Sequence, residues 1–298
     1  MQVLVIGSEG FIGQHLCRHL SMEGFDVSSA DIIALTRDDY FQINPMEPDY
    51  SKIFSARKFD FCINASGQAN VRQSFDQPKL DYDSNTVTVF RLLDAIRLSS
   101  PQCKFLQLSS AAVYGNTTEK ILREDYPLLP FSPYGYHKLM AELVCREFYT
   151  FYKIPTCSMR LFSVYGEGQA KLLLWDMWQK YHRNTRLVEL FGSGEERRDY
   201  IYINDLMHAI VTIMKNHPFN GDAINVANGS GISIKDVAGI FFKQLDNNTE
   251  LRFSQQAKSG DPNSLVADVS TLRGYGYEPK FSMENGLSNY IKWLTERK

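Results

Sequence analysis

Residues 105–138 read FLQLSSAAVYGNTTEKILREDYPLLPFSPYGYHK, and this stretch decides the fold that we expect for the whole chain. It starts with an apolar run at residues 105–108, which predicts a buried strand, and ends at Tyr134 and Lys138, four residues apart. The pair Ser132-Pro133 directly before them is typical of a helix N-terminus. Side chains at positions i and i+4 of a helix lie on one face. The stretch therefore predicts a strand, a long loop and a helix that presents Tyr134 and Lys138 together.

Tyr134 and Lys138 are candidates for an acid–base pair. Tyrosine alone is a poor base because its pKa is near 10. A lysine ammonium about 5 Å away, at an effective dielectric constant near 20, favours the phenolate by roughly 3 kcal/mol, which predicts a pKa about two units lower. Ser110, at the end of the expected strand, is placed to hold the hydroxyl whose proton the tyrosine takes. The alternative is a surface tyrosine and a solvated lysine, since a YxxxK pattern alone is common by chance.

A second motif occupies the N-terminus, where an apolar run at residues 3–6 is followed by GSEGFIG. A strand, closely spaced glycines and a helix are typical of a dinucleotide site, because glycines permit a tight turn and a close approach of the pyrophosphate. The spacing is GxxGxxG, and either glycine pattern alone is a weak signal. The residues that we expect to bind the cofactor here are Gly7, Gly10, Phe11, Ile12 and Gly13.

Two further strands extend the predicted cofactor site. Residues 25–31 end in Asp31, a carboxylate placed to bind the adenosine ribose and to repel a 2′-phosphate, which favours NAD over NADP. The alternative for Asp31 is a simple turn residue, and NADP stays possible because Arg37 nearby offers a partner for the phosphate. Residues 59–64 form another expected strand, and the small residues Ala65, Ser66 and Gly67 after it let a cofactor lie against the backbone.

Strand and helix patterns alternate through residue 162, which predicts a doubly wound parallel sheet of the Rossmann-like α/β class. Residues 38–57 are polar, so any strand there is short. Residues 80–98 predict a helix, 155–162 a strand, and 134–152 a helix that is apolar on more than one face. We expect an NAD-binding domain at residues 1–165, with a return segment near 198–227. A smaller mixed α/β substrate-binding domain is expected at residues 166–298.

The C-terminal half predicts small mixed elements that cap the sheet. We expect a short strand at residues 223–226 and helices at 205–214, 234–245 and 284–294; the apolar runs at 172–178 and 187–190 are assigned no element. Tandem arginines, Arg197 and Arg198, suggest a contact with an anion, because a guanidinium can bind phosphate through two hydrogen bonds. A solvated pair on a β-hairpin explains them equally well.

Composition excludes several other classes of protein. The chain has 298 residues, 44% hydrophobic and 22% charged, with a net charge of −2. We therefore expect a globular protein with no attraction to nucleic acid or to an anionic membrane. No apolar run reaches the roughly 20 residues that span a bilayer, and the N-terminus enters a strand without a basic leader. Five widely spaced cysteines predict buried thiols in a reducing cytoplasm and no metal site.

Taken in order, these motifs resemble the extended short-chain dehydrogenase/reductase family, in its NAD-dependent epimerase/dehydratase group acting on nucleotide sugars. The resemblance covers nearly the whole chain and also includes Arg160 to Gly166, Arg198-Asp199-Tyr200 and Gly260-Asp261. It implies that Ser110 and Tyr134 are the catalytic pair and that Lys138 binds the nicotinamide ribose. It also implies that Arg198 meets the substrate diphosphate.

The sequence departs from the family's pattern around the substrate. Ala111 and Ala112 stand where dehydratases of the family carry an acid, so 4,6-dehydration is not expected. Ala112 also replaces a threonine that the sugar 4-epimerases commonly have. Ser163 replaces a usual asparagine, Lys258 replaces an arginine that often grips the phosphate, and Asn64 replaces a frequent histidine. The resemblance assigns the substrate to Ala111, Ser163, Arg198 and Lys258, in a pocket that differs from the common one.

Three functions follow from the resemblance. The leading one is an NAD-dependent 4-epimerase of a nucleotide-diphosphate sugar, which Asp31 and a recycled NAD favour. The second is a 4-ketoreductase of a 4-keto-6-deoxy nucleotide sugar, which the altered pocket favours. The third is an inactive dinucleotide-binding sensor, against which the presence of both Tyr134 and Lys138 argues. We also expect a homodimer that packs through helices 80–98 and 134–152, because their outward faces are apolar.

Overall fold

A computed structural model describes residues 1–117, 119, 121–245, 248–256 and 264–296 of the chain. Its largest element is a sheet of seven strands that all run parallel. From one edge to the other, the strands are β10 (Asn220–Val226), β6 (Thr156–Leu161), β5 (Lys104–Ser110), β4 (Phe61–Asn64), β1 (Gln2–Ile6), β2 (Asp26–Asp31) and β3 (Tyr40–Gln42).

Strand β1 lies inside this sheet and pairs with β2 on one side and β4 on the other, so the chain order reverses next to it. Its side chains alternate between the two faces of the sheet, as the period of a strand requires. Val3 and Val5 belong to one apolar core, and Leu4 and Ile6 belong to a second. Ligands of doubly wound sheets bind in the crevice where the strand order reverses, which places the cofactor site beyond the end of β1.

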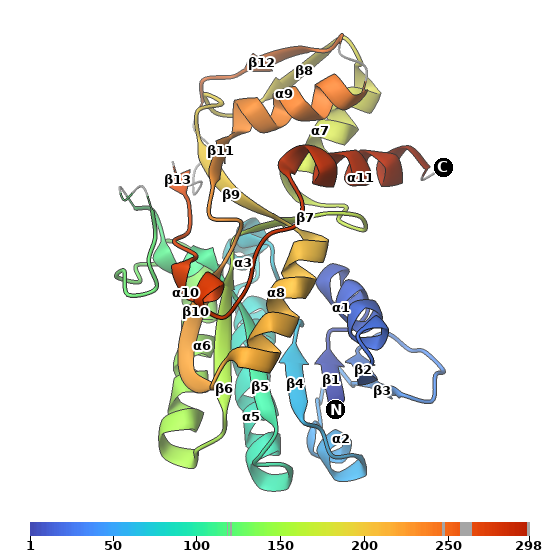
Figure 1. The fold of residues 1–298 in the computed structure, drawn as a ribbon, viewed down its shortest axis with the longest axis vertical. Helices are drawn as coiled ribbons and strands as arrows, with labels where there is room; N and C mark the ends of the chain where they lie inside the picture. Colours follow the sequence, from blue (N-terminus) through green and yellow to red (C-terminus); the bar gives the residue numbers. More distant parts are fainter. Residues whose placement is uncertain (118, 120, 246–247, 257–263, 297–298) are drawn as a thin grey trace.

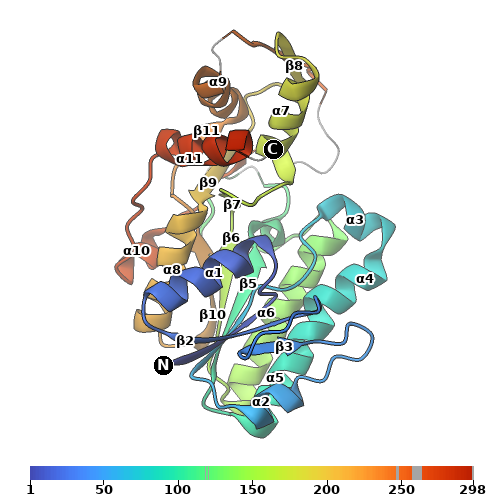
Figure 2. The same cartoon turned by 90° about the vertical axis from the view of Figure 1, so that its right-hand side faces the viewer.

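Helices cover both faces of the sheet (Figure 2). One face carries α1 (Phe11–Met22) and α8 (Ile203–Asn216), which pack against each other. The opposite face is covered by helical elements from before and after β5, namely α2 (Ser51–Ala56), α3 (Val71–Asp76), α4 (Pro78–Tyr82), η1 (Asp83–Val87), α5 (Thr88–Ser99) and α6 (Pro133–Tyr152). The prediction of a doubly wound Rossmann-like fold is confirmed.

A smaller set of elements lies beyond the carboxyl ends of the parallel strands (Figure 1). It contains a four-stranded sheet, in which β9 pairs with three other strands, and a separate pair of strands. Its elements are β7 (Ser163–Tyr165), α7 (Leu172–Arg183), β8 (Leu187–Leu190), β9 (Arg197–Tyr202), β11 (Gly231–Ser233), α9 (Ile234–Leu245), β12 (Glu250–Phe253), β13 (Ser264–Leu265) and α11 (Met283–Glu296). The short helix α10 (Ser270–Gly274) lies instead beside β10 of the parallel sheet.

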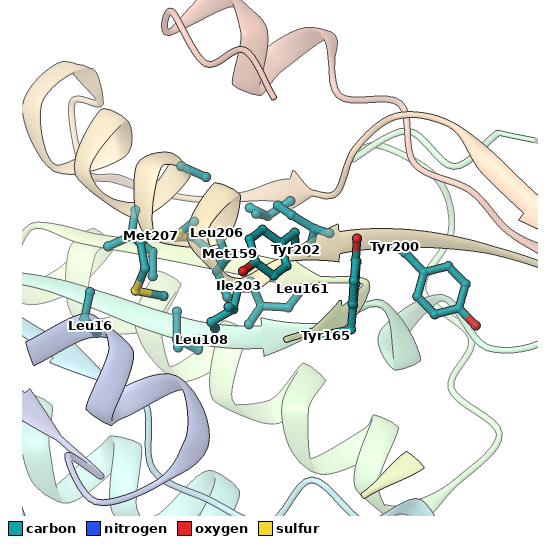
Figure 3. Close-up of a cluster of buried hydrophobic side chains, with 14 of the residues drawn as sticks. Leu16, Leu108, Met159, Leu161, Tyr165, Tyr200, Tyr202, Ile203, Leu206 and Met207 are labelled. Atoms are coloured by element: carbon teal, nitrogen blue, oxygen red, sulfur yellow. The ribbon is translucent and has the colours of Figure 1, made fainter. Parts of the chain in front are cut away.

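An apolar cluster joins the two parts of the molecule (Figure 3). Leu108, Met159 and Leu161 of the parallel sheet meet Leu16 of α1 and the buried side of α8 there. The tyrosines of β7 and β9 continue this cluster into the smaller part. Because one continuous core spans both parts, we expect them to move little relative to each other.

Three sequence predictions about elements are wrong or incomplete. The helix expected at 80–98 runs from residue 78 to 99 but contains a π-helical turn, η1, in its first half. Residues 172–178, to which the sequence analysis assigned no element, open α7, whose buried side chains include Leu174 and Trp178. The polar segment 38–57 holds the short strand that was expected and also the helix α2, which buries Ile53 and Phe54.

Within the described part of the chain, no helix has both the length and the hydropathy that crossing a bilayer requires.

Candidate active site

The N-terminal turn of α6 positions Tyr134 at the edge of the parallel sheet. Ser132 caps the helix, since its Oγ accepts a hydrogen bond from Gly135 N at 3.1 Å, and Pro133 occupies the first turn as predicted. A Cβ built on Gly135 would lie 2.7 Å from the carbonyl oxygen of Ala112. Glycine is therefore needed for this turn to approach the short helix η2 (Ala111–Tyr114) that follows Ser110.

Tyr134, Ser110 and Lys138 come together as the sequence predicted. The Tyr134 side chain interacts with that of Ser110 and is only 7% exposed. The Nζ of Lys138 lies 5.9 Å from the centre of the Tyr134 ring and donates a hydrogen bond to Leu108 O at 3.0 Å. Ser110 ends β5, so strand, helix and cap together fix all three groups.

The predicted lowering of the Tyr134 pKa is wrong for this structure. Burial, helped by the Asp81 carboxylate, raises the pKa of Tyr134 to about 12, although the interaction with Ser110 opposes both. Burial also lowers the pKa of Lys138 to about 8. The sequence estimate counted the lysine charge but could not include the loss of solvent around both side chains. The phenolate form of Tyr134 therefore needs additional positive charge nearby.

A contact between a histidine and a buried aspartate next to this site was not foreseen from the sequence. His137 Nδ1 lies 2.5 Å from Asp81 Oδ2, and Asp81 is 2% exposed. No described residue donates a hydrogen bond to the other carboxylate oxygen, Oδ1. Asp81 acts electrostatically on both Tyr134 and Lys138. His137 directly precedes Lys138 in the sequence, but Asp81 lies 56 residues before His137. The sequence therefore gave little indication that the two side chains meet.

Asn85 is a second residue that the sequence analysis missed. It lies in the π-helical turn η1, and its Nδ2 donates to Gln68 O at 3.1 Å. Its Oδ1 is buried, and nothing in the described residues donates to it. A Cβ on Gly67 would lie 2.5 Å from this oxygen, so Asn85 packs directly against the small-residue loop of the predicted cofactor site. It stands in the polar run DYDSNT at residues 81–86, where nothing in the sequence distinguishes it from its neighbours.

The glycine loop fits a dinucleotide. Gly7 has a φ of +79°, and a Cβ there would lie 2.6 Å from Ser66 N. A Cβ on Gly13 would lie 2.0 Å from Gly7 O. Backbone of the loop, of α1 and of residues 65–67 therefore meets without intervening side chains, as a pyrophosphate site requires. Phe11 and Ile12 open α1 and are half-buried beside the loop.

Asp31 ends β2 as predicted and holds the glycine loop. Its Oδ2 accepts from Glu9 N at 2.9 Å, and its Oδ1 accepts from Ile32 N at 2.7 Å. Arg37, the alternative phosphate partner, is bound to the Glu9 carboxylate at 2.5 Å and lies over the ring of Tyr40. Asp31 and the glycine loop fit the adenosine end of NAD. The buried Asn85 oxygen and Lys138 fit the nicotinamide end.

Three of the four expected substrate residues lie on described elements, namely η2, β7 and β9. Ala111 directly follows Ser110 and is 4% exposed. Ser163 begins β7, which pairs with β9 in register with Tyr200. Arg198 lies two residues before Tyr200 on β9 and so projects from the same face of the strand. Lys258 and the Gly260-Asp261 pair lie outside the described residues.

A buried polar network supports the site from the side. Arg160 of β6 contacts Glu142 of α6 at 2.9 Å and donates to the hydroxyl of Tyr114 at 2.9 Å. Glu142 also accepts from Ser109 Oγ at 2.5 Å, and Tyr114 donates to Asn225 at 2.6 Å. Arg160 is 3% and Glu142 is 8% exposed. The network links β5, β6, β10, α6 and η2, so it fixes the helix that carries Tyr134 against the strand that carries Ser110.

A cysteine, a histidine and a carboxylate meet near the opposite edge of the sheet, which the sequence spacing did not indicate. The possible ligand atoms of Cys157, His217 and Asp222 lie within 4.8 Å of one another. His217 Nδ1 accepts a hydrogen bond from Phe219 N at 2.9 Å, so the ring proton is on Nε2, 3.0 Å from Asp222. Burial raises the pKa of the Cys157 thiol. A protonated Nε2 and a neutral thiol favour a packed polar cluster over a metal site.

Comparisons with known proteins agree with this geometry. A family model described as NAD dependent epimerase/dehydratase family matches residues 3–227. An uncharacterized UDP-glucose epimerase of Bacillus subtilis is 27% identical over 315 residues, covering 99% of this chain and 98% of the relative. UDP-glucose 4-epimerase of Lactobacillus helveticus is 28% identical over 322 residues, covering 98% and 97% of the two chains.

Solved structures add a neighbour with a bound cofactor. UDP-glucuronic acid 4-epimerase from Bacillus cereus, in complex with UDP-glucuronic acid and NAD, superimposes with a TM-score of 0.89. It is 25% identical, and each chain is covered completely. A family match over residues 3–227 and a matching fold across the full chain lead to one assignment. The chain belongs to the NAD-dependent epimerase/dehydratase family, as its sequence motifs predicted, and its cofactor is NAD.

Proposed function

We propose that this protein is a 4-epimerase of a nucleotide-diphosphate sugar, with a UDP-sugar as substrate. The observation that supports the proposal most strongly is the placement of Tyr134 beside Ser110 and Lys138 where strand β5 ends. Relatives and structural neighbours that match along nearly their full length carry UDP-sugar 4-epimerase names. Residues 166–298, apart from the return segment that forms α8 and β10, are proposed to bind the substrate.

In this proposal each site residue has one task. NAD, when bound, supplies a group that accepts a hydride from C4 of the sugar and can return it. Ser110 holds the C4 hydroxyl, and Tyr134 takes its proton and later gives it back. Lys138 binds the nicotinamide ribose and adds positive charge beside the tyrosine. Ala111 and Ser163 contact the sugar nucleotide, and Arg198 binds the diphosphate.

The raised pKa of Tyr134 determines what its catalytic role requires. A buried tyrosine with a pKa of about 12 is a poor base at neutral pH. The ammonium of Lys138, whose pKa is about 8, is largely charged at pH 7, but it does not offset the burial of Tyr134. Acid–base catalysis by Tyr134 is therefore expected to depend on positive charge that the loaded site contributes. Without that charge, the tyrosine stays protonated and inactive.

Product analysis without added cofactor tests the proposal. Purified protein is denatured, and the released nucleotide is identified by mass spectrometry; we expect NAD. The native protein is then incubated with UDP-glucose, UDP-glucuronic acid or UDP-N-acetylglucosamine, and the 4-epimers are separated by anion-exchange chromatography. Conversion of one of these sugars without net NADH formation supports a 4-epimerase. Consumption of added NADPH with a 4-keto-6-deoxy sugar nucleotide, and no epimer, would identify the reductase instead.

We also propose a homodimer, supported by a stripe of exposed apolar side chains on α6. Tyr136, Met140, Leu143 and Phe151 are 50%, 40%, 54% and 75% exposed, and their spacing places them on one helix face. Phe90 of the neighbouring α5 is 46% exposed. Two copies of this face would bury the stripe in a four-helix bundle. Light scattering should give twice the monomer mass at micromolar concentration, and Leu143→Glu should give a monomer.

A further inference from the structure

Glu9 occupies an unusual place for a carboxylate, inside the glycine loop between Gly7 and Gly10. Its backbone N donates a hydrogen bond to Asp31 Oδ2 at 2.9 Å. The backbone of Glu9 therefore lies beside the carboxylate that is predicted to bind the ribose. That carboxylate accepts hydrogen bonds from Arg37 Nη2 at 2.5 Å and from Ser8 Oγ at 3.3 Å. The function proposed above gives Glu9 no task.

Arg37 is the cation that the Glu9 carboxylate holds in place. It lies on the segment between β2 and β3, with its guanidinium 5.0 Å from the ring centre of Tyr40. Its side chain is 52% exposed, whereas that of Glu9 is 21% exposed. An arginine next to the end of β2 is the type of residue that accommodates the 2′-phosphate of NADP. In this structure its charge is directed at a carboxylate of the glycine loop.

The charges of Glu9, Asp31 and Arg37 together disfavour the binding of a phosphate. Glu9 and Asp31 carry two negative charges, and Arg37 offsets only one of them. A phosphate monoester adds nearly two further negative charges at neutral pH, and a site rejects a ligand most effectively by repulsion or by unpaired charge. Removal of the Glu9 charge would change two things at once, because it lowers the repulsion and releases the guanidinium for bidentate binding.

We propose that Glu9 is a specificity-determining residue, which restricts the protein to NAD(H) by holding Arg37 away from the position of a 2′-phosphate. Asp31 alone would repel the phosphate, but it would leave Arg37 able to compensate. This inference rests on NAD binding and not on the identity of the sugar, so it can fail while the proposed 4-epimerase function stands.

The competing explanation is that the ion pair only stabilises the loop. Partly exposed ion pairs typically contribute between about 0 and 1 kcal/mol to stability. A stabilising role predicts that loss of the pair weakens NAD⁺ and NADP⁺ binding equally. A specificity role predicts opposite or unequal changes, and it predicts that the effect requires Arg37.

Calorimetric titration of NAD⁺ and NADP⁺ separates these explanations. The protein is stripped of bound nucleotide, and wild type is compared with Glu9→Gln, Arg37→Met and the double variant at fixed ionic strength. Glu9→Gln keeps the size of the side chain and the backbone N–H that binds Asp31. We expect it to tighten NADP⁺ binding about tenfold, the effect of one charge-assisted contact, with NAD⁺ affinity changed by less than about threefold.

The double variant decides the mechanism. If Glu9 acts by holding Arg37, the gain in NADP⁺ affinity disappears when Arg37 is also replaced. Glu23→Gln is the matched control, because it removes the same charge at the other end of α1, where Glu23 pairs with Lys215. An unchanged NADP⁺ affinity in Glu9→Gln, an equal loss for both nucleotides, or a gain that persists in the double variant would each overturn the proposal.

Discussion

Two buried polar clusters lie on α6, one turn apart, and they differ in how completely their hydrogen bonds are satisfied. Toward the C-terminus, the Glu142 carboxylate accepts from Ser109 and repeatedly from Arg160, and Arg160 donates also to Tyr114 and to a backbone carbonyl. Toward the N-terminus, Lys138 donates to one carbonyl, and Asp81 keeps an oxygen to which no described residue donates.

This contrast separates structural from functional burial. Native proteins satisfy nearly all buried polar groups, so a cluster that retains binding capacity calls for an explanation. The Glu142–Arg160 network has a partner for each charge and joins three strands to a helix. The cluster around Tyr134 contains a lysine whose pKa burial lowers to about 8 and a tyrosine whose pKa burial raises to about 12. We infer that the first cluster stabilises the fold and that the second is completed by ligands.

The largest expected effect is on catalysis. Tyr134→Phe retains the ring and removes the group that transfers the proton, so turnover should fall about 10²–10⁴-fold. Stability should change by only about 1 kcal/mol, the typical contribution of one hydrogen bond. Tyr136→Phe, two residues along the same helix and 50% exposed, is the control and should leave turnover intact. Full activity of Tyr134→Phe on the true substrate would exclude the proposed mechanism.

The next effect is a loss of stability, which we expect on disrupting the Glu142–Arg160 network and not at the cluster around Tyr134. Arg160→Met leaves the Glu142 carboxylate buried without its partner, so the free energy of unfolding should fall by about 3–5 kcal/mol. Urea denaturation followed by circular dichroism measures this change. Arg146→Met, on an exposed position of α6, should change it by less than about 0.5 kcal/mol. Similar values for the two variants would show that the network contributes little.

Replacing the buried cation by methionine in the cluster around Tyr134 should raise the free energy of unfolding, whereas Arg160→Met lowers it. Burial disfavours the charge of Lys138, so Lys138→Met should raise the stability of the cofactor-free protein by about 1–3 kcal/mol at pH 7 while it weakens NAD binding. Leu108 O still accepts from Gln107, so no carbonyl is orphaned.

The pH dependence provides an independent check on Lys138. Between pH 8 and its ordinary pKa of 10.5, the folded protein has lost the Lys138 proton and the unfolded chain still binds it. Wild-type stability should therefore rise relative to Lys138→Met as the pH increases through this window. Lys79→Met, at an exposed position, should show no such difference. A destabilised Lys138→Met variant would contradict the distinction between the two clusters.

The smallest effect concerns Asp81. Its carboxylate raises the pKa of Tyr134, so Asp81→Asn should lower that pKa and move the acidic limb of the pH–rate profile down by about half a unit to one unit. Asp83→Asn, which removes an exposed partner of Lys79, is the matched control and should leave the profile in place. An unchanged limb in Asp81→Asn would show that the Asp81–His137 pair has only a structural role.

The sequence alone was sufficient for the parts of the protein that depend on local pattern. The apolar run before GSEGFIG, Asp31 at the end of the second strand, and Ser132-Pro133 before Tyr134 predicted the cofactor loop, the strand end and the helix cap that the structure contains. Each of these features is specified by neighbouring residues, through turn geometry, capping or strand burial. The order of the motifs likewise predicted the family.

The tertiary structure decided whatever depends on groups distant in sequence. Asp81 and His137 are separated by 56 residues, Glu9 and Arg37 by 28, and Glu142 and Arg160 by 18, and no local pattern indicates that they meet. The pKa of Tyr134 moved against the sequence prediction because the loss of solvent around a buried side chain depends on the whole surrounding fold. Charge and spacing can be read along the chain, but burial and partnership arise only when it packs.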